Sequence, residues 1–140
     1  MDREKILKAL NEALAQEHGC YIRYKTHAAV ITGPYAEAVS TRLKEIAADE
    51  SEHAEKLRDR ITALGGEPTM ETDKAELIAA TNLKQIIAVN LKEEAKAIDH
   101  YKSILRMVDR QEEVLLYEVI EDIIEDEQEH REELSRLQEG

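Results

Sequence analysis

Two copies of the motif Asp-Glu-x-Glu-His carry side chains of the kinds that bind metal ions. The first copy occupies residues 49–53, and the second occupies residues 126–130, which is 77 positions later. The same offset relates Glu17 to Glu94, and each of these acids precedes the Glu-x-x-His of its motif by 33 residues. The chain therefore contains two related halves, each with three candidate metal ligands. The six candidates are Glu17, Glu50, His53, Glu94, Glu127 and His130.

Helical spacing of the apolar residues places these acids in a protein core. Glu127 follows Ile120 by seven residues and precedes Leu134 by seven, so it lies in the middle of an apolar stripe. The other three acids hold similar positions, and each His lies one turn beyond the Glu of its motif. Glu52 and Glu129, which directly precede the two His residues, are expected to face solvent instead.

The elements that must hold these residues are four long amphipathic helices. The apolar pattern predicts helices over residues 3–31, 35–64, 83–108 and 112–138. The first stripe includes Tyr21 and Tyr24, and the second helix ends at consecutive glycines with a proline just beyond.

Residues 67–75 form the one obvious connector, in which Thr72 or Asp73 is expected to cap the helical structure that follows. Abundant Ala, Leu, Glu and Lys, with only two Pro, are typical of an all-helical protein. We therefore predict a single domain over residues 1–140. Its fold class is all-α, a four-helix bundle with a long crossover between the second and third helices.

The helical turns bring the acids to one height. In sequence, Glu17 and Glu50 are equally far from the turn between the first two helices, and Glu94 and Glu127 are equally far from the turn between the last two. Antiparallel helices joined at these turns therefore place each pair of carboxylates at the same height. Burying four ionised carboxylates together costs several kcal/mol each unless cations or protons compensate them. One Glu-x-x-His could arise by chance in a Glu-rich chain, but two on core stripes with matched upstream acids predict a dinuclear metal site.

Composition excludes several other classes of function. A net charge of −12 disfavours binding to nucleic acid and to anionic membrane surfaces. The sequence has no apolar run of the ~20 residues that a membrane span needs, and no signal-peptide core at its start. The single cysteine, Cys20, rules out an intramolecular disulfide, so a reducing cytoplasm is the expected compartment. We expect Cys20, His18, His27 and His100 to be packing or surface residues.

Carboxylate-rich coordination with one His per metal suits iron or manganese better than structural zinc. The whole chain resembles the ferritin-like superfamily, in particular bacterioferritin. Three segments and one short constellation carry this resemblance: residues 10–17, residues 49–57, residues 126–130, and Glu94 with Ala97, Ile98 and Tyr101.

The resemblance implies a role for each candidate. Glu17 and His53 would be terminal ligands of one iron, Glu94 and His130 of the other, and Glu50 and Glu127 would bridge the two. Asp49 and Asp126 would each orient the His of the opposite half. Tyr24 and Tyr101 are candidate catalytic residues, which would hydrogen-bond the ligand carboxylates or supply an electron.

The function implied is oxidation of Fe(II) by dioxygen or hydrogen peroxide at two irons per chain, with manganese as an alternative metal. The chain is also expected to form a homo-oligomer, at least a dimer. Ser51 stands where bacterioferritin has its haem-binding Met, so no haem is expected there. The chain ends ten residues after His130, without the fifth helix of cage-forming members, which argues against a storage shell. Two alternatives stay open: a rubrerythrin-like peroxidase with an external electron donor, and a non-enzymatic metal-binding or shell-forming bundle.

Overall fold

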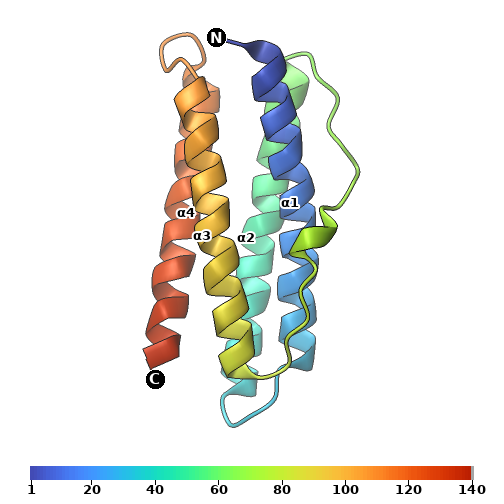
Figure 1. Ribbon diagram of the computed structural model, residues 1–140, viewed down its shortest axis with the longest axis vertical. Helices are drawn as coiled ribbons and strands as arrows, with labels where there is room; N and C mark the ends of the chain where they lie inside the picture. Colours follow the sequence, from blue (N-terminus) through green and yellow to red (C-terminus); the bar gives the residue numbers. More distant parts are fainter. Residues whose placement is uncertain (140) are drawn as a thin grey trace.

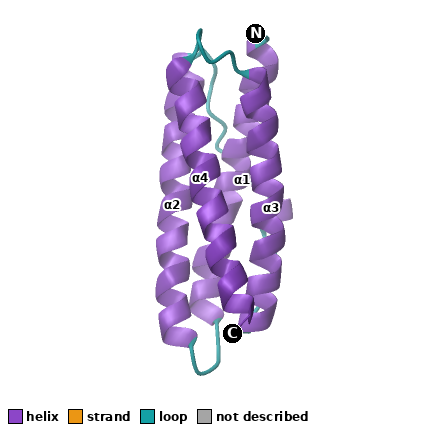
Figure 2. Ribbon diagram, turned by 90° about the vertical axis from the view of Figure 1, so that its left-hand side faces the viewer, coloured by secondary structure: helices purple, strands orange, loops and turns teal. Residues whose placement is uncertain are grey.

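The computed structural model describes residues 1–139 and contains four long helices. These are α1 (Arg3–Val30), α2 (Ala36–Ala63), α3 (Leu83–Met107) and α4 (Val114–Glu139), and a short 3-10 helix, η1 (Lys74–Glu76), lies between α2 and α3. The long helices run side by side as a bundle (Figures 1 and 2). The predicted all-α four-helix bundle with a long crossover between α2 and α3 is confirmed.

Local sequence signals set the helix ends. The Asp2 side chain accepts a hydrogen bond from the Lys5 backbone N–H at 3.2 Å, and Asn82 caps α3 in the same way. Gly33, in the α1–α2 turn, and Gly65, directly after the C-cap of α2, have φ angles of 113° and 86°, which residues with a Cβ rarely adopt. Asp73 caps η1 through the Ala75 N–H at 3.0 Å, so one of the two predicted caps is confirmed.

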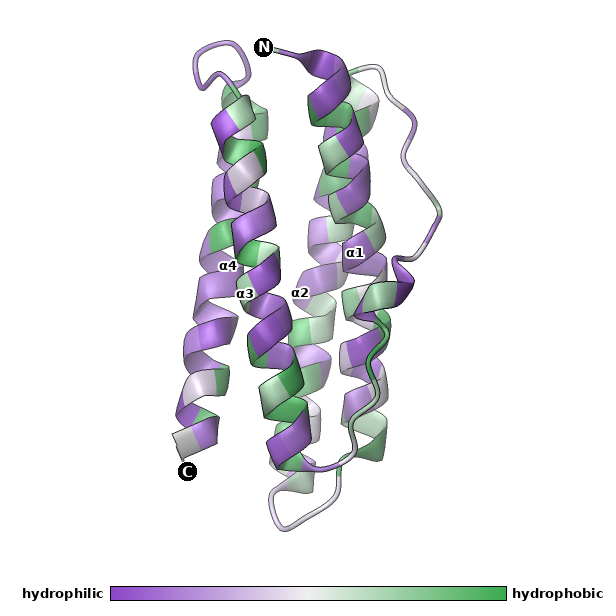
Figure 3. Ribbon diagram, viewed as in Figure 1, coloured by the Kyte–Doolittle hydropathy of each residue, from purple (hydrophilic) through white to green (hydrophobic). Residues whose placement is uncertain are grey.

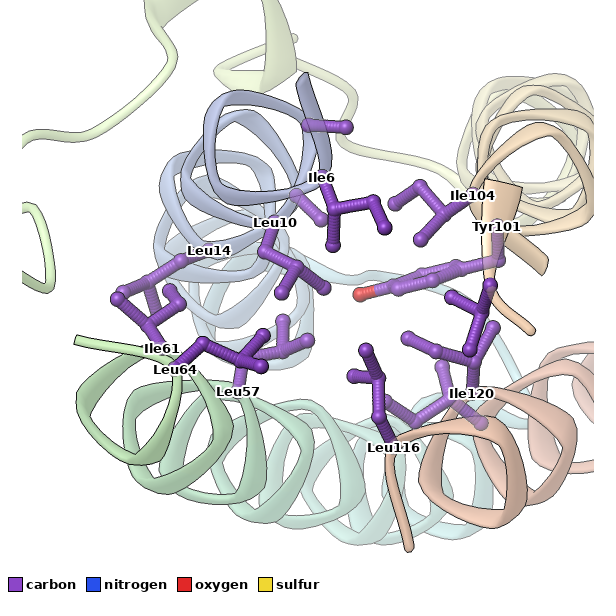
Figure 4. Packing of buried hydrophobic residues seen from close by; sticks show 14 of the residues in the cluster. Ile6, Leu10, Leu14, Leu57, Ile61, Leu64, Tyr101, Ile104, Leu116 and Ile120 are labelled. Atoms are coloured by element: carbon purple, nitrogen blue, oxygen red, sulfur yellow. The ribbon is translucent and has the colours of Figure 1, made fainter. Parts of the chain in front are cut away.

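The core consists of two apolar clusters on the inner faces of the helices. The larger cluster lies toward the end of the bundle that holds the N-terminus and the α3–α4 turn, and Figure 4 shows its packing around Leu10, Leu57 and Ile120. The smaller cluster surrounds Leu43 and Ile46, toward the α1–α2 turn. Along α1, α2 and α3 the candidate ligands lie between the two clusters. Figure 3 shows hydrophilic residues interleaved with apolar ones, as expected of amphipathic helices.

The crossover, residues 64–82, runs along the outside of α1 (Figure 1). It covers a face of α1 on which Cys20, Arg23 and His27 are buried. The prediction that Tyr21 belongs to the core stripe is therefore wrong, because in this half of α1 the buried residues include those that face the crossover, and Tyr21 is not among them. The Tyr21 side chain is 40% exposed.

Candidate metal centre

All six candidate ligands lie in the interior of the bundle, and each long helix contributes at least one of them. None is more than 2% exposed. Their ligand atoms form two groups, within each of which all atoms lie within 4.8 Å of one another. One group contains Glu17 and His53, and the other contains Glu94 and His130. Glu50 and Glu127 belong to both groups, which makes the arrangement a double site with two shared carboxylates.

Both imidazoles present Nδ1 to the carboxylates. His53 Nδ1 lies 3.2 Å from Glu17 Oε2 and 3.4 Å from Glu127 Oε1. His130 Nδ1 lies 3.5 Å from Glu50 Oε1 and 3.6 Å from Glu127 Oε1. Both imidazole rings therefore direct the same nitrogen, Nδ1, into the cluster of carboxylates.

The opposite ring nitrogens contact the aspartates of the two motifs. His53 Nε2 lies 2.8 Å from Asp126 Oδ2, and His130 Nε2 lies 2.9 Å from Asp49 Oδ2. The two Asp side chains are partly exposed, at 47% and 40%. A carboxylate at Nε2 favours the tautomer that carries its proton there, which leaves Nδ1 free to act as a ligand.

Burial and crowding change the protonation of the centre. Burial, followed by the charges of neighbouring carboxylates, raises the pKa of Glu50 to about 8. Burial likewise raises the pKa of Glu127, with the charge of Glu50 as the next cause. Burial works to lower the pKa of His53, but the hydrogen bond and charge of Glu17 outweigh it and raise this pKa to about 10. At His130 burial again works to lower the pKa, but the hydrogen bond and charge of Glu94 outweigh it and raise this pKa to about 9. Protons therefore balance the carboxylates when cations do not.

Several buried polar atoms of the centre have no hydrogen-bond partner among residues 1–139. They are both carboxylate oxygens of Glu50, Glu94 Oε2, Glu127 Oε1 and His130 Nδ1. Such atoms are normally satisfied in proteins. Carboxylate oxygens and imidazole nitrogens are ligands for iron and manganese. A pair of cations would satisfy these atoms, so the residues present fit a dinuclear metal centre.

The two tyrosines related by the repeat make different contacts. Tyr24, which is fully buried, donates a hydrogen bond from its hydroxyl to Glu94 Oε1 at 2.5 Å. The Tyr101 hydroxyl has no partner within the described part of the chain. Of the two tyrosines, only Tyr24 therefore contacts a candidate ligand through its hydroxyl within the described part of the chain.

A buried polar network that the sequence pattern does not predict lies beside the centre. Arg23 Nη1 donates to Glu76 Oε1 at 2.9 Å and to the Glu76 carbonyl at 3.0 Å, and Arg23 Nε donates to Asn90 Oδ1 at 2.9 Å. His27, expected to be a packing or surface residue, is fully buried, and its Nε2 lies 2.8 Å from the Ile78 carbonyl. Asn90 lies four residues before Glu94 on the same stripe, which is the one signal that could have revealed this network.

None of the helices within residues 1–139 is long and apolar enough to cross a membrane. Residues 7–139 match the profile of the ferritin-like domain family. The bacterioferritin of Desulfovibrio desulfuricans is 30% identical over 129 residues, which cover 91% of this chain and 71% of that protein.

Three solved structures share the whole fold. A ferritin-like di-iron carboxylate protein of Bacillus anthracis has a TM-score of 0.91 at 28% identity, with 99% of both chains covered. The dodecameric thioferritin of Bacteroides fragilis has a TM-score of 0.89 at 26% identity, covering 98% of this chain and 86% of that one. The D. desulfuricans bacterioferritin, described with its di-iron site in different catalytic states, has a TM-score of 0.85 at 26% identity and covers 98% and 80%. This chain therefore belongs to the ferritin-like family, and its two buried Glu/His groups are of the di-iron carboxylate type.

Proposed function

We propose that this protein takes up two iron ions per chain and oxidises Fe(II), with dioxygen or hydrogen peroxide as the electron acceptor. The observation that carries the proposal is the pair of buried ligand groups with two shared carboxylates and several polar atoms that lack partners among residues 1–139. Bacterioferritin with a di-iron site is among the relatives of the chain, which supports iron over manganese.

The ligand roles follow from membership of the two groups. Glu17 and His53 would be terminal ligands of one iron, because each belongs to one group only. Glu94 and His130 would hold the other iron for the same reason. Glu50 and Glu127 would be bridging ligands, since both groups contain them.

The surrounding residues would prepare these ligands for binding. Asp126 and Asp49 hold the two imidazoles with Nδ1 directed at the carboxylates. Tyr24 fixes the position of Glu94 through its hydrogen bond, and it is also the residue that we assign as a source of one electron. The apolar clusters on both sides exclude bulk water, which strengthens the electrostatic interactions inside. Bound iron would supply the redox chemistry and the binding site for the oxidant.

The protein is also proposed to act as a homo-oligomer, at least a dimer. The basis is the assembly of one relative, which is described as dodecameric. Sedimentation analysis of the purified chain would test this proposal independently of iron binding.

Anaerobic titration with Fe(II) followed by exposure to oxygen tests the main proposal. We expect two tightly bound irons per chain and repeated oxidation beyond that amount. Glu50→Ala and Glu127→Ala should lose tight binding, because each removes a ligand from both groups. Glu129→Ala is the matched control, since Glu129 is exposed and lies one residue before His130.

Three outcomes of this experiment differ in meaning. Unchanged iron content in Glu50→Ala and Glu127→Ala would overturn the ligand assignment. Oxidation that stops once the two irons per chain have reacted would show a metal-binding bundle rather than an enzyme. Oxidation that turns over with hydrogen peroxide but requires an added reductant would favour a peroxidase.

A further inference from the structure

Tyr101 is a buried polar residue whose hydroxyl has no defined use in the proposed centre. Its side chain is 1% exposed and belongs to the larger apolar cluster. Figure 4 shows its ring extending from α3 into the interior of the bundle, with the hydroxyl on the side of α1. Among residues 1–139 no group accepts or donates a hydrogen bond to this hydroxyl. An unsatisfied buried hydroxyl destabilises a fold, whereas a phenylalanine ring would fill the same space without that penalty.

The internal repeat shows what Tyr101 would contact if the two halves were equivalent. The 77-residue offset maps the Tyr24–Glu94 pair onto Tyr101 and Glu17. Tyr24 donates to Glu94 at 2.5 Å, but Glu17 instead pairs through Oε2 with His53 Nδ1 at 3.2 Å. The Tyr24 hydroxyl therefore donates to a ligand carboxylate, whereas the Tyr101 hydroxyl donates to no group among residues 1–139.

The surroundings of Tyr101 keep the hydroxyl protonated. Burial raises the pKa of Tyr101 well above its ordinary value, and the charges of Glu17, Glu127 and Glu50 raise it further. Tyr101 lies two turns after the ligand Glu94 on α3, just as Tyr24 lies two turns after Glu17 on α1. Because the Tyr24 hydroxyl reaches a ligand carboxylate, the equivalent position places the Tyr101 phenol beside the centre. It faces the centre from the side of the larger apolar cluster, whereas Tyr24 belongs to the smaller cluster on the opposite side.

We propose that the Tyr101 hydroxyl is a hydrogen-bond donor for a small exogenous ligand with lone pairs, of the peroxide class, bound at the metal pair on the side of the larger apolar cluster. The inference rests on the proposed function, because such a ligand requires the metals. It goes beyond it by assigning the side on which the oxidant binds. Tyr24 cannot serve the same ligand without giving up its bond to Glu94.

Azide is a suitable probe, since it binds oxidised iron and accepts hydrogen bonds. The oxidised, iron-loaded protein would be titrated with azide and followed by absorbance, in Tyr101→Phe and in the matched control Tyr117→Phe, a tyrosine near the start of α4 that packs against the same cluster. We expect Tyr101→Phe to weaken azide binding by about tenfold, as for loss of a hydrogen bond to a charged group. Tyr117→Phe should change azide affinity by less than about twofold, because Tyr117 lies ten residues, nearly three turns, before Glu127 on α4.

Thermal unfolding of the metal-free variants gives a readout that needs no iron. Tyr101→Phe should unfold at the same temperature as the parent chain or higher, because it removes a hydroxyl without a partner. Tyr24→Phe should unfold at a lower temperature, because it leaves Glu94 without its donor. A loss of stability in Tyr101→Phe as large as that in Tyr24→Phe would overturn the inference.

The azide experiment distinguishes failure of the role proposed for Tyr101 from failure of the proposed function. Two irons per chain in Tyr101→Phe, with azide affinity equal to that of the parent, would overturn the inference and leave the proposed function intact. Failure of the parent chain to take up iron would overturn both. If Tyr101→Phe loads poorly, the infrared stretch of azide in the parent chain decides the matter: it should shift between H2O and D2O, and the absence of a shift would overturn the inference.

Discussion

His53 on α2 and Asp126 on α4 belong to opposite halves of the repeat, yet His53 Nε2 lies 2.8 Å from Asp126 Oδ2. The reciprocal pair, His130 and Asp49, is 2.9 Å apart. The first acid of each motif therefore positions the imidazole of the other motif. Because of this exchange, neither half of the chain can orient its own His, and the ligand geometry depends on the α2–α4 packing.

The first prediction concerns this exchange. Asp126→Ala should weaken metal binding at the group that contains His53 by about 10- to 100-fold, because that imidazole loses the carboxylate that orients it. Competition with a chelator, followed for each of the two metal equivalents, measures the effect. Asp122→Ala is the control, since Asp122 is exposed one turn earlier on α4. Equal weakening of both metal equivalents would contradict the assignment of Asp126 to His53.

A second prediction follows from the protonation of the metal-free centre. The pKa of Glu50 is raised to about 8 and that of His53 to about 10, so the folded state binds more protons than the unfolded chain. Stability should therefore be greatest below the ordinary values of these groups and should fall as pH rises through the raised values. Thermal unfolding in excess chelator should give a lower midpoint at about pH 9 than at about pH 6.

Glu50→Gln is the control for this pH dependence. Its uncharged amide removes one of the groups that must lose a proton, so the decrease in midpoint should be smaller. Iron affinity should change in the opposite direction and increase with pH, because the ligands must be deprotonated to bind. A metal-free protein that becomes more stable toward alkaline pH would contradict the protonation described for Glu50 and His53.

Periodicity in the sequence predicts the four long helices but not the structure of the crossover that packs against them. The 3.6-residue repeat predicts the four helices, and the 77-residue offset explains why Glu50 and Glu127 reach the same height. Neither pattern contains information on the path of the crossover. Only the structure could establish features that depend on that path or on side-chain geometry. These are the burial of Arg23, the exposure of Tyr21 and the absence of a partner for the Tyr101 hydroxyl among residues 1–139.

A third prediction tests the buried ion pair under the crossover. Glu76→Gln should destabilise the fold by about 3 kcal/mol, because it leaves the Arg23 guanidinium buried without its counter-charge. Urea unfolding of the metal-free protein measures this loss. Glu71→Gln is the control, since Glu71 is exposed on the same crossover. A stability equal to that of the parent would contradict the assignment of Glu76 as the counter-charge that stabilises buried Arg23.

The last prediction concerns the contact between the crossover and α1. Glycine within a helix is normally less stable than alanine by roughly 1 kcal/mol, so Gly19→Ala would stabilise an exposed helix. Here the added Cβ would meet Glu76 Cβ at 2.6 Å and the Asp73 carbonyl oxygen at 2.9 Å. Neither atom is the end of a flexible side chain, so the crossover must move away from α1. The clash should outweigh the gain in helix propensity and give a net loss of about 1–3 kcal/mol.

Displacement of the crossover gives this variant a distinctive signature. Limited proteolysis should cut Gly19→Ala within residues 64–82 faster than the parent chain, because η1 no longer packs closely against α1. Ser51→Ala is the control: Ser51 is exposed on α2, and its replacement should leave proteolysis unchanged. Iron uptake should remain at two per chain, because all six candidate ligands lie on the four long helices rather than on the crossover. Faster proteolysis together with loss of iron would instead show that the crossover contributes to the geometry of the centre.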